Sequence, residues 1–119
     1  GHVEVNEWAS VGGGVLIHQF CKVGSHVFVG GGYRIVQDVP PFIRAVKDPL
    51  EYSGINSTGL QRRGFSQKER STIKNFYRYY FRSELTRTAA LEKAEHEFSS
   101  DPYIKKILEF IYSSERGII

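Results

Sequence analysis

Aliphatic residues recur at every sixth position over the first third of the chain. The series is Val5, Val11, Ile17, Val23, Val29 and Ile35. Neither an α-helix, with about 3.6 residues per turn, nor a strand, with a period of two, keeps such residues on one face. A chain that turns a corner after every hexapeptide does, and three sides close a triangular coil. The pattern therefore predicts a left-handed parallel β-helix built from hexapeptide repeats.

The repeat also predicts where the coil stacks, turns and ends. The expected stacked pairs are Val5 with Val23, Val11 with Val29, and Ile17 with Ile35. Gly12, Gly24 and Gly30 directly follow aliphatic positions, and glycine suits corners that need unusual backbone dihedrals. Pro40 and Pro41 cannot donate hydrogen bonds to a strand ladder, so the coil is expected to end there.

The rest of the chain has the pattern of amphipathic helices. Residues 1–41 are interpreted as the last coils of the β-helix, 42–64 as a connecting segment, and 65–119 as a small α-helical domain. Ser66 and Glu69 form a capping box that predicts a helix from Ser66. A second helix is expected over 87–98 and a third from Asp101, which precedes a proline. The expected apolar stripes are Ile73, Phe76, Tyr77, Tyr80 and Phe81 in the first helix, and Ile104, Ile107, Leu108 and Ile111 in the third.

Composition narrows the class of protein. The chain has 119 residues, of which 40% are hydrophobic and 24% charged, as in a soluble globular protein of one domain or two small units. Its apolar runs are far shorter than the roughly 20 residues needed to cross a bilayer, and no secretory leader is visible. We expect a cytoplasmic protein without membrane insertion. The single cysteine, Cys21, is expected to be a buried structural thiol, and the histidines lack the compact spacing of a metal site.

Positive charge is concentrated in the first predicted helix and the residues before it. Residues 62–87 contain eight basic and two acidic side chains, which suggests an anionic partner. Arg70, Lys74, Arg78 and Arg82 recur every four residues beside the apolar stripe. From the residues alone, this stripe is either a solvated helix face or a docking surface for an acidic protein.

Four segments are distinctive in combination. They are Gly1-His2-Val3, His18-Gln19-Phe20-Cys21, Gln37-Asp38-Val39-Pro40-Pro41, and Gly59-Leu60-Gln61-Arg62-Arg63-Gly64-Phe65. With these motifs, essentially the whole chain resembles the carboxyl-terminal portion of the UDP-N-acetylglucosamine O-acyltransferases of lipid A biosynthesis. The nearest alternative is a related hexapeptide-repeat acyltransferase that acts on another amino sugar.

The resemblance implies an activity and an assembly. Such enzymes transfer a 3-hydroxyacyl group from acyl carrier protein to the 3-hydroxyl of UDP-N-acetylglucosamine, and they are homotrimers with active sites between adjacent β-helices. They use no cofactor beyond the phosphopantetheine of the acyl carrier protein. Their general base is a histidine in a His-x-x-His-Asp segment, which this chain lacks. Because the coil is in register from the first residue, we expect this chain to be part of a longer protein.

The resemblance also assigns roles to individual residues. Gly1 matches an oxyanion donor and His2 a residue of the active-site cleft. His18 and Gln19 match substrate contacts, and the residues that match contacts to the nucleotide and its diphosphate are Asn56, Arg62 and Arg63. Thr58 stands where the family often has glutamate. Phe28 and Gly31 fall in the region that sets acyl-chain length, and the docking surface for acyl carrier protein is expected at Lys74, Arg78 and Arg82.

A non-catalytic alternative also follows from the basic segment. The aromatic residues of the first predicted helix could stack on the bases of a nucleic acid. They fall on the stripe expected to be buried, however, and no nucleic-acid-binding motif is present. The favoured expectation is therefore an acyltransferase that does not bind nucleic acid.

Overall fold

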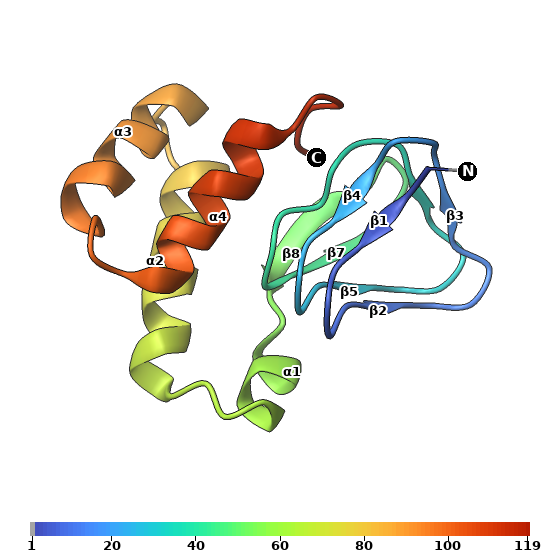
Figure 1. The fold of residues 1–119 in the computed structure, drawn as a ribbon, viewed down its shortest axis with the longest axis horizontal. Helices are drawn as coiled ribbons and strands as arrows, with labels where there is room; N and C mark the ends of the chain where they lie inside the picture. Colours follow the sequence, from blue (N-terminus) through green and yellow to red (C-terminus); the bar gives the residue numbers. More distant parts are fainter. Residues whose placement is uncertain (1) are drawn as a thin grey trace.

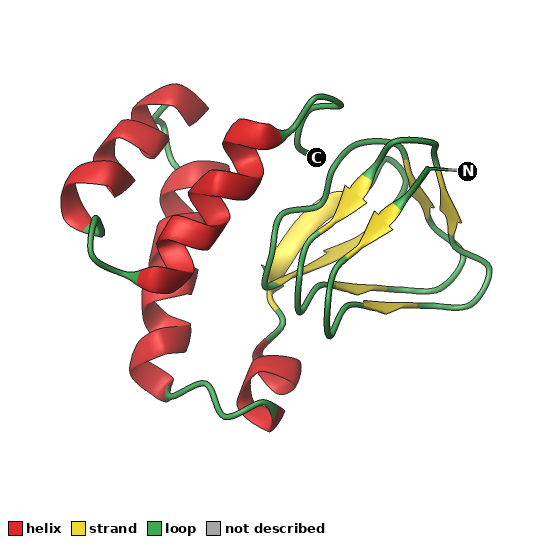
Figure 2. Ribbon diagram, in the orientation of Figure 1, coloured by secondary structure: helices red, strands yellow, loops and turns green. Residues whose placement is uncertain are grey.

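The computed structural model describes residues 2–119 and places a β-helix beside a group of helices (Figure 1). Six strands of two residues each form its coils: β1 Glu4–Val5, β2 Ser10–Val11, β3 Leu16–Ile17, β4 Lys22–Val23, β5 Phe28–Val29 and β6 Arg34–Ile35. All pair in parallel, and the register places Val5 against Val23, Val11 against Val29 and Ile17 against Ile35. Figure 2 shows the short strands separated by loops at the corners. The predicted left-handed β-helix followed by a helical domain is confirmed.

The coil does not end at Pro40 and Pro41, so that prediction is wrong. Strand β7, Ile43–Val46, pairs in parallel with β5 and places Ala45 against Val29, while Val39 bridges to Val23. From Val29 to Ala45 the chain advances sixteen positions, whereas the coil below advances eighteen, from Val11 to Val29. The prolines lie at a corner, where no ladder donor is needed. The expected connecting segment 42–64 therefore contains β7, the antiparallel strand β8 (Glu51–Ile55) and the short helix α1 (Ser57–Arg62).

The unusual dihedrals expected at Gly12, Gly24 and Gly30 occur elsewhere. Residues with positive φ stand three positions after the aliphatic residues, again six apart, at Trp8, Gly14, Phe20, His26 and Gly32. Gly24 has a different role. A Cβ atom there would lie 2.5 Å from the backbone nitrogen of Pro41 in the next coil. Glycine at this position therefore allows neighbouring coils to approach closely.

Three longer helices follow: α2 Gln67–Arg82, α3 Arg87–Glu97 and α4 Pro102–Ser113. The capping box of Ser66 and Glu69 is confirmed by both of its hydrogen bonds. The predicted apolar stripes are buried, except that Phe81 is only partly covered. No helix within residues 2–119 is long and apolar enough to cross a membrane.

Two polar groups attach the helices to the coil. The fully buried Tyr77 hydroxyl on α2 donates a hydrogen bond to the Pro41 carbonyl oxygen, at 2.6 Å. The Asp38 carboxylate accepts from the Lys22 backbone N–H at 2.7 Å and from the Ser114 hydroxyl at 2.5 Å. Cys21 is buried in the coil as predicted, and burial raises the pKa of its thiol. The two parts of the chain therefore share one continuous core.

Candidate functional site

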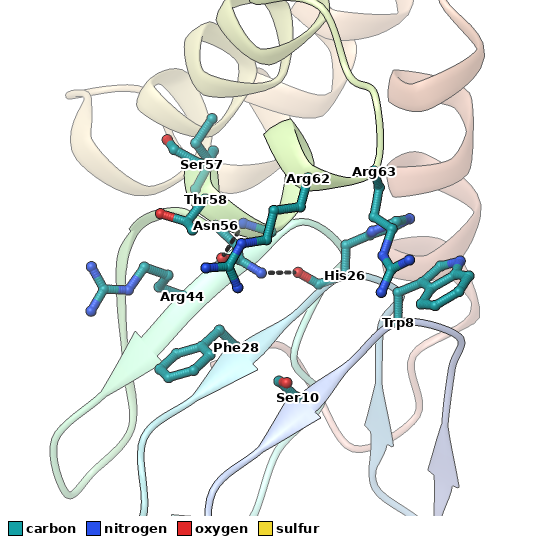
Figure 3. A pocket seen from close by; sticks show the side chains of 12 residues that line it. Trp8, Ser10, His26, Phe28, Arg44, Asn56, Ser57, Thr58, Arg62 and Arg63 are labelled. Atoms are coloured by element: carbon teal, nitrogen blue, oxygen red, sulfur yellow. Dashed lines mark hydrogen bonds between the residues drawn. The ribbon is translucent and has the colours of Figure 1, made fainter.

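A cavity of about 540 Å³ lies where α1 faces one corner of the β-helix (Figure 3). Its lining comes from the coil, from the β7–β8 pair and from α1 with its N-cap. The lining residues are Trp8, Ser10, His26, Phe28, Arg44, Ile55, Asn56, Ser57, Thr58, Gly59, Arg62 and Arg63. Residues far apart in the sequence therefore line the same cavity.

Asn56 fixes α1 to the coil. Its backbone N–H donates to the Phe42 carbonyl oxygen at 2.8 Å, and its side-chain Nδ2 donates to the His26 carbonyl oxygen at 2.9 Å. Its Oδ1 atom accepts from the Gly59 N–H at 3.2 Å, which makes Asn56 the N-cap of the helix. One side chain therefore sets both the start of α1 and its position over the corner.

The cavity is strongly positive. Arg62 ends α1, Arg63 is its C-cap residue, and Arg44 projects from β7 above the ring of Phe28, with 5.8 Å from the guanidinium carbon to the ring centroid. The guanidinium carbon of Arg63 lies over the Trp8 ring, 3.6 Å from its centroid. Within the described part of the chain, no carboxylate lines this cavity. Arginine binds phosphate oxygens through paired N–H groups, so the arrangement suits a ligand with a phosphate or diphosphate.

His26 forms the buried floor of this corner. Its ring packs 5.7 Å from the ring of Phe42 and 5.1 Å from that of Phe65. Burial lowers the pKa of its imidazole; the positive charges of Lys106 and Arg63 act in the same direction, and Glu7 opposes them. Burial and these two positive charges therefore disfavour the protonated form of the ring.

This environment predicts an acid sensitivity. The unfolded chain takes up a proton on His26 near the ordinary pKa of 6.5, whereas the folded chain does so only at lower pH. Between the two values the free energy of unfolding should fall with decreasing pH, by at most about 1.4 kcal/mol per pH unit. Asparagine tolerates the positive φ at this position, so the matched variant is His26→Asn. When the free energy of unfolding is measured by urea denaturation between pH 5 and 8, this part of its pH dependence should be absent in the variant. Equal slopes in both proteins would contradict the prediction.

A second group of polar residues lies at a different corner. His2 stacks on Phe20, with ring centroids 5.6 Å apart and an interplanar angle of 4°. Arg116, near the carboxyl end of the described chain, places Nη2 3.1 Å from Nδ1 of His18. Because a guanidinium only donates hydrogen bonds, Nδ1 of His18 is the acceptor and the neutral ring carries its proton on Nε2. His18 thus presents an N–H group to the surface.

Comparisons with known proteins identify the family. Residues 38–119 match the family model described as UDP-N-acetylglucosamine O-acyltransferase, domain 2. The chain belongs to this family. An O-acyltransferase of this name from Thiobacillus denitrificans is 40% identical over all 119 residues, which correspond to 46% of that protein. A solved UDP-N-acetylglucosamine acyltransferase from Bacteroides fragilis is 45% identical with a TM-score of 0.94, and the match covers 98% of this chain and 46% of that one. The corresponding structure from Francisella novicida is 33% identical with a TM-score of 0.95, and the match covers 100% of this chain and 44% of that one.

The chain therefore spans about half the length of the UDP-N-acetylglucosamine O-acyltransferases that it matches. Of the residues that the family resemblance assigned, Asn56, Arg62, Arg63 and Phe28 meet in the cavity, together with Thr58. Gly1 lies outside the described residues. His2, His18 and Gln19 belong to the other corner, and Gly31 lies beside Gly13 of the lower coil, outside the cavity.

The basic stripe lies on a third surface. Lys74 and Arg78 are exposed on α2, and the Arg82 guanidinium lies 4.9 Å from the centroid of the Tyr52 ring on β8. None of the three lines the cavity. The aromatic residues of α2 are mostly buried against the coil and the other helices, so they do not offer a surface for stacking on bases.

Sequence reasoning missed Trp8, Ser10 and Arg44 as site residues. Arg44 was placed in a connecting segment, although the alternation Ile43-Arg44-Ala45-Val46 is that of a half-buried strand with its arginine outward. Trp8 stands in the same six-residue register as Phe20 and His26, which is a second repeat in the sequence. The strand alternation around Arg44 and the register of Trp8 are both visible in the sequence. Neither pattern indicates which corner of the coil α1 covers.

The Arg116 contact predicts a tautomer that can be measured. Long-range ¹H–¹⁵N spectra of the wild-type protein above pH 8 should show the ring proton of His18 predominantly on Nε2. Replacing Arg116 with methionine removes the donor and should shift the ring toward the mixture found in free imidazoles. The ring proton of His96, which lies on α3 away from this corner, should not respond. A wild-type His18 protonated mainly on Nδ1 would disprove the assignment.

Proposed function

We propose that this chain supplies the nucleotide-binding and acyl-carrier-binding part of a cytoplasmic enzyme. The enzyme transfers an (R)-3-hydroxyacyl group from acyl carrier protein to the 3-hydroxyl of UDP-N-acetylglucosamine, the first step of lipid A biosynthesis. The observation that carries the proposal is the cavity beneath α1, which Arg44, Arg62 and Arg63 line and which no described carboxylate lines. A diphosphate matches that charge, and Phe28 offers apolar surface beside it.

The separation of the two polar corners supports an active site shared between subunits. His2 and His18 do not line the arginine cavity of their own chain, because they lie at a different corner of the coil. A homotrimer of parallel β-helices would place one corner of each subunit against the other corner of its neighbour. We therefore propose a homotrimer with its substrate between adjacent coils.

The chemistry is acyl transfer. The sugar 3-hydroxyl oxygen attacks the thioester carbonyl carbon, a base takes the hydroxyl proton, and the C–S bond breaks to release the phosphopantetheine thiol. In this proposal the base is a histidine outside these 119 residues, the Gly1 backbone N–H stabilises the oxyanion, and His2 lines the cleft. Through Nε2–H, His18 donates a hydrogen bond to the substrate, and Gln19 contacts it from the same corner.

The basic stripe of α2 supports docking of the acyl carrier protein. Such carriers are acidic, and Lys74 and Arg78 are exposed without an ion-pair partner among the described residues. Complementary charge mainly accelerates association, so charge reversal at Lys74 should raise the KM for the acyl carrier more than it lowers kcat. Phe28 and Gly31 remain the proposed acyl-chain contacts.

The deciding experiment measures transfer from 3-hydroxyacyl carrier protein to UDP-N-acetylglucosamine by this chain and by a chain extended upstream. Turnover by the longer chain alone supports the assignment of the base to the upstream segment. Turnover by the 119-residue chain would place the base within it, at His2 or His18. Transfer to a different UDP-amino sugar in preference to UDP-N-acetylglucosamine would favour the related acyltransferase.

A further inference from the structure

We propose that Trp8 is a positioning residue that holds the Arg63 guanidinium in place to bind the diphosphate of the nucleotide. This inference rests on the proposed function, since it concerns the same cavity. It assigns a role to the most conspicuous exposed aromatic side chain at the site. The family match did not assign this residue.

The contact between Arg63 and the face of the Trp8 ring is close. The guanidinium carbon of Arg63 lies 3.6 Å from the centroid of the Trp8 ring, although 55 positions separate the two residues in the sequence, from 8 to 63. Figure 3 shows the two side chains side by side at one edge of the cavity. Trp8 is 54% exposed, so packing in the core does not explain it.

Stacking leaves the binding edge of the guanidinium available. The attraction acts through the face of the group, whereas its N–H donors lie in its plane and point away from the indole. Within residues 2–119, Arg63 forms no salt bridge. Holding an otherwise mobile arginine before the ligand arrives lowers the entropy lost on binding. Arg62, its neighbour, has no such aromatic partner among the described contacts and provides an internal comparison.

The backbone at Trp8 strengthens the inference. Its φ is +61°, a conformation that glycine adopts at lower cost and that Gly14 and Gly32 adopt at equivalent corners. In this six-residue series, the other corners with a side chain carry an aromatic ring with a stacking partner: Phe20 with His2, and His26 with Phe42. Lys47, which also has a positive φ, lies outside the series, between β7 and β8. Unfavourable dihedrals at a ligand site commonly persist because the residue has a role there.

The test is a pair of double-mutant cycles on the full 119-residue chain, with UDP as the probe in calorimetric titrations. We expect Trp8→Leu to weaken UDP binding about 3- to 10-fold, and Trp8→Phe to restore most of the affinity. In an Arg63→Ala background, Trp8→Leu should have less than about a 2-fold effect, because its target is gone. In an Arg62→Ala background it should keep its full effect. An equal loss in the Arg63→Ala background would overturn the proposal in favour of direct contact between Trp8 and the ligand.

A second measurement needs no ligand. Trp8 is the only tryptophan of the chain, so its fluorescence reports on this contact alone. Arg63→Ala should increase acrylamide quenching of Trp8, and the matched variant Arg62→Ala should not. Unchanged quenching in Arg63→Ala would overturn the stack itself. If the wild-type chain shows the stack but does not bind UDP, the proposed function fails and the binding role of the stack fails with it.

Discussion

Replacing both Arg62 and Arg63 with alanine should weaken UDP binding about 1,000-fold. Each guanidinium can form charge-assisted hydrogen bonds with the diphosphate, and the loss of such a bond costs roughly 1.5–3 kcal/mol. No carboxylate among the described residues lines the cavity, and Arg44 is the other arginine in its wall. Arg44 can therefore compensate only in part. Calorimetric titration of the double variant with UDP measures the effect.

A matched control separates these local contacts from net charge. Lys68 and Lys105 are exposed, lie outside the cavity and have no role in the proposed mechanism. Replacing both with alanine removes as many positive charges as the arginine double variant. Because long-range attraction is largely screened at 0.15 M salt, the affinity for UDP should then change by less than about 2-fold. A comparable loss in this control would assign the affinity to overall charge, and the arginine cavity would no longer support the proposed function.

Alanine at Gly24 should destabilise the coil severely. The added Cβ would lie 2.5 Å from the Pro41 nitrogen and 2.7 Å from the Pro41 Cα atom, which are backbone atoms with little freedom to move. We expect a loss at or above the upper end of the roughly 1–3 kcal/mol that is typical of overpacking. Urea denaturation followed by far-UV circular dichroism measures the loss.

Gly13→Ala provides the comparison. Gly13 also lies in the coil, but a Cβ atom there would have no heavy atom within 4 Å apart from those of its two neighbours in the sequence. Its free energy of unfolding should change by no more than about 0.5 kcal/mol. Similar losses in the two variants would show that the close approach of the coils at Gly24 is not the cause of the destabilisation.

Local signals predicted much of the fold. The six-residue period gave the stacked pairs of the coil because each pair is a fixed step apart in the sequence. The capping box at Ser66 and the Asp101-Pro102 pair marked helix starts, since caps depend on neighbouring residues. The continuation past Pro40 and Pro41 was missed because the step shortens to sixteen residues there and the period is lost.

The site was predictable only in part. Family motifs singled out Asn56, Arg62 and Arg63, and all three line the cavity because they lie on or beside one short helix. That Trp8 and Arg44 complete the cavity depends on where α1 lies over the coil. The hydrogen bond from Asn56 to the His26 carbonyl oxygen sets that position, and no local pattern encodes a contact between residues thirty positions apart.

The hairpin of β7 and β8 limits how this molecule can be enlarged. β8 pairs with β7 in the antiparallel direction, and its Tyr52 packs on Tyr77 and Phe81 of α2. β8 thereby occupies the free edge of β7, the last parallel strand on this side of the solenoid, so a further parallel coil cannot stack on β7. Engineering a taller solenoid would require whole coils to be inserted before Val39, with the hairpin and helices kept as a fixed end piece.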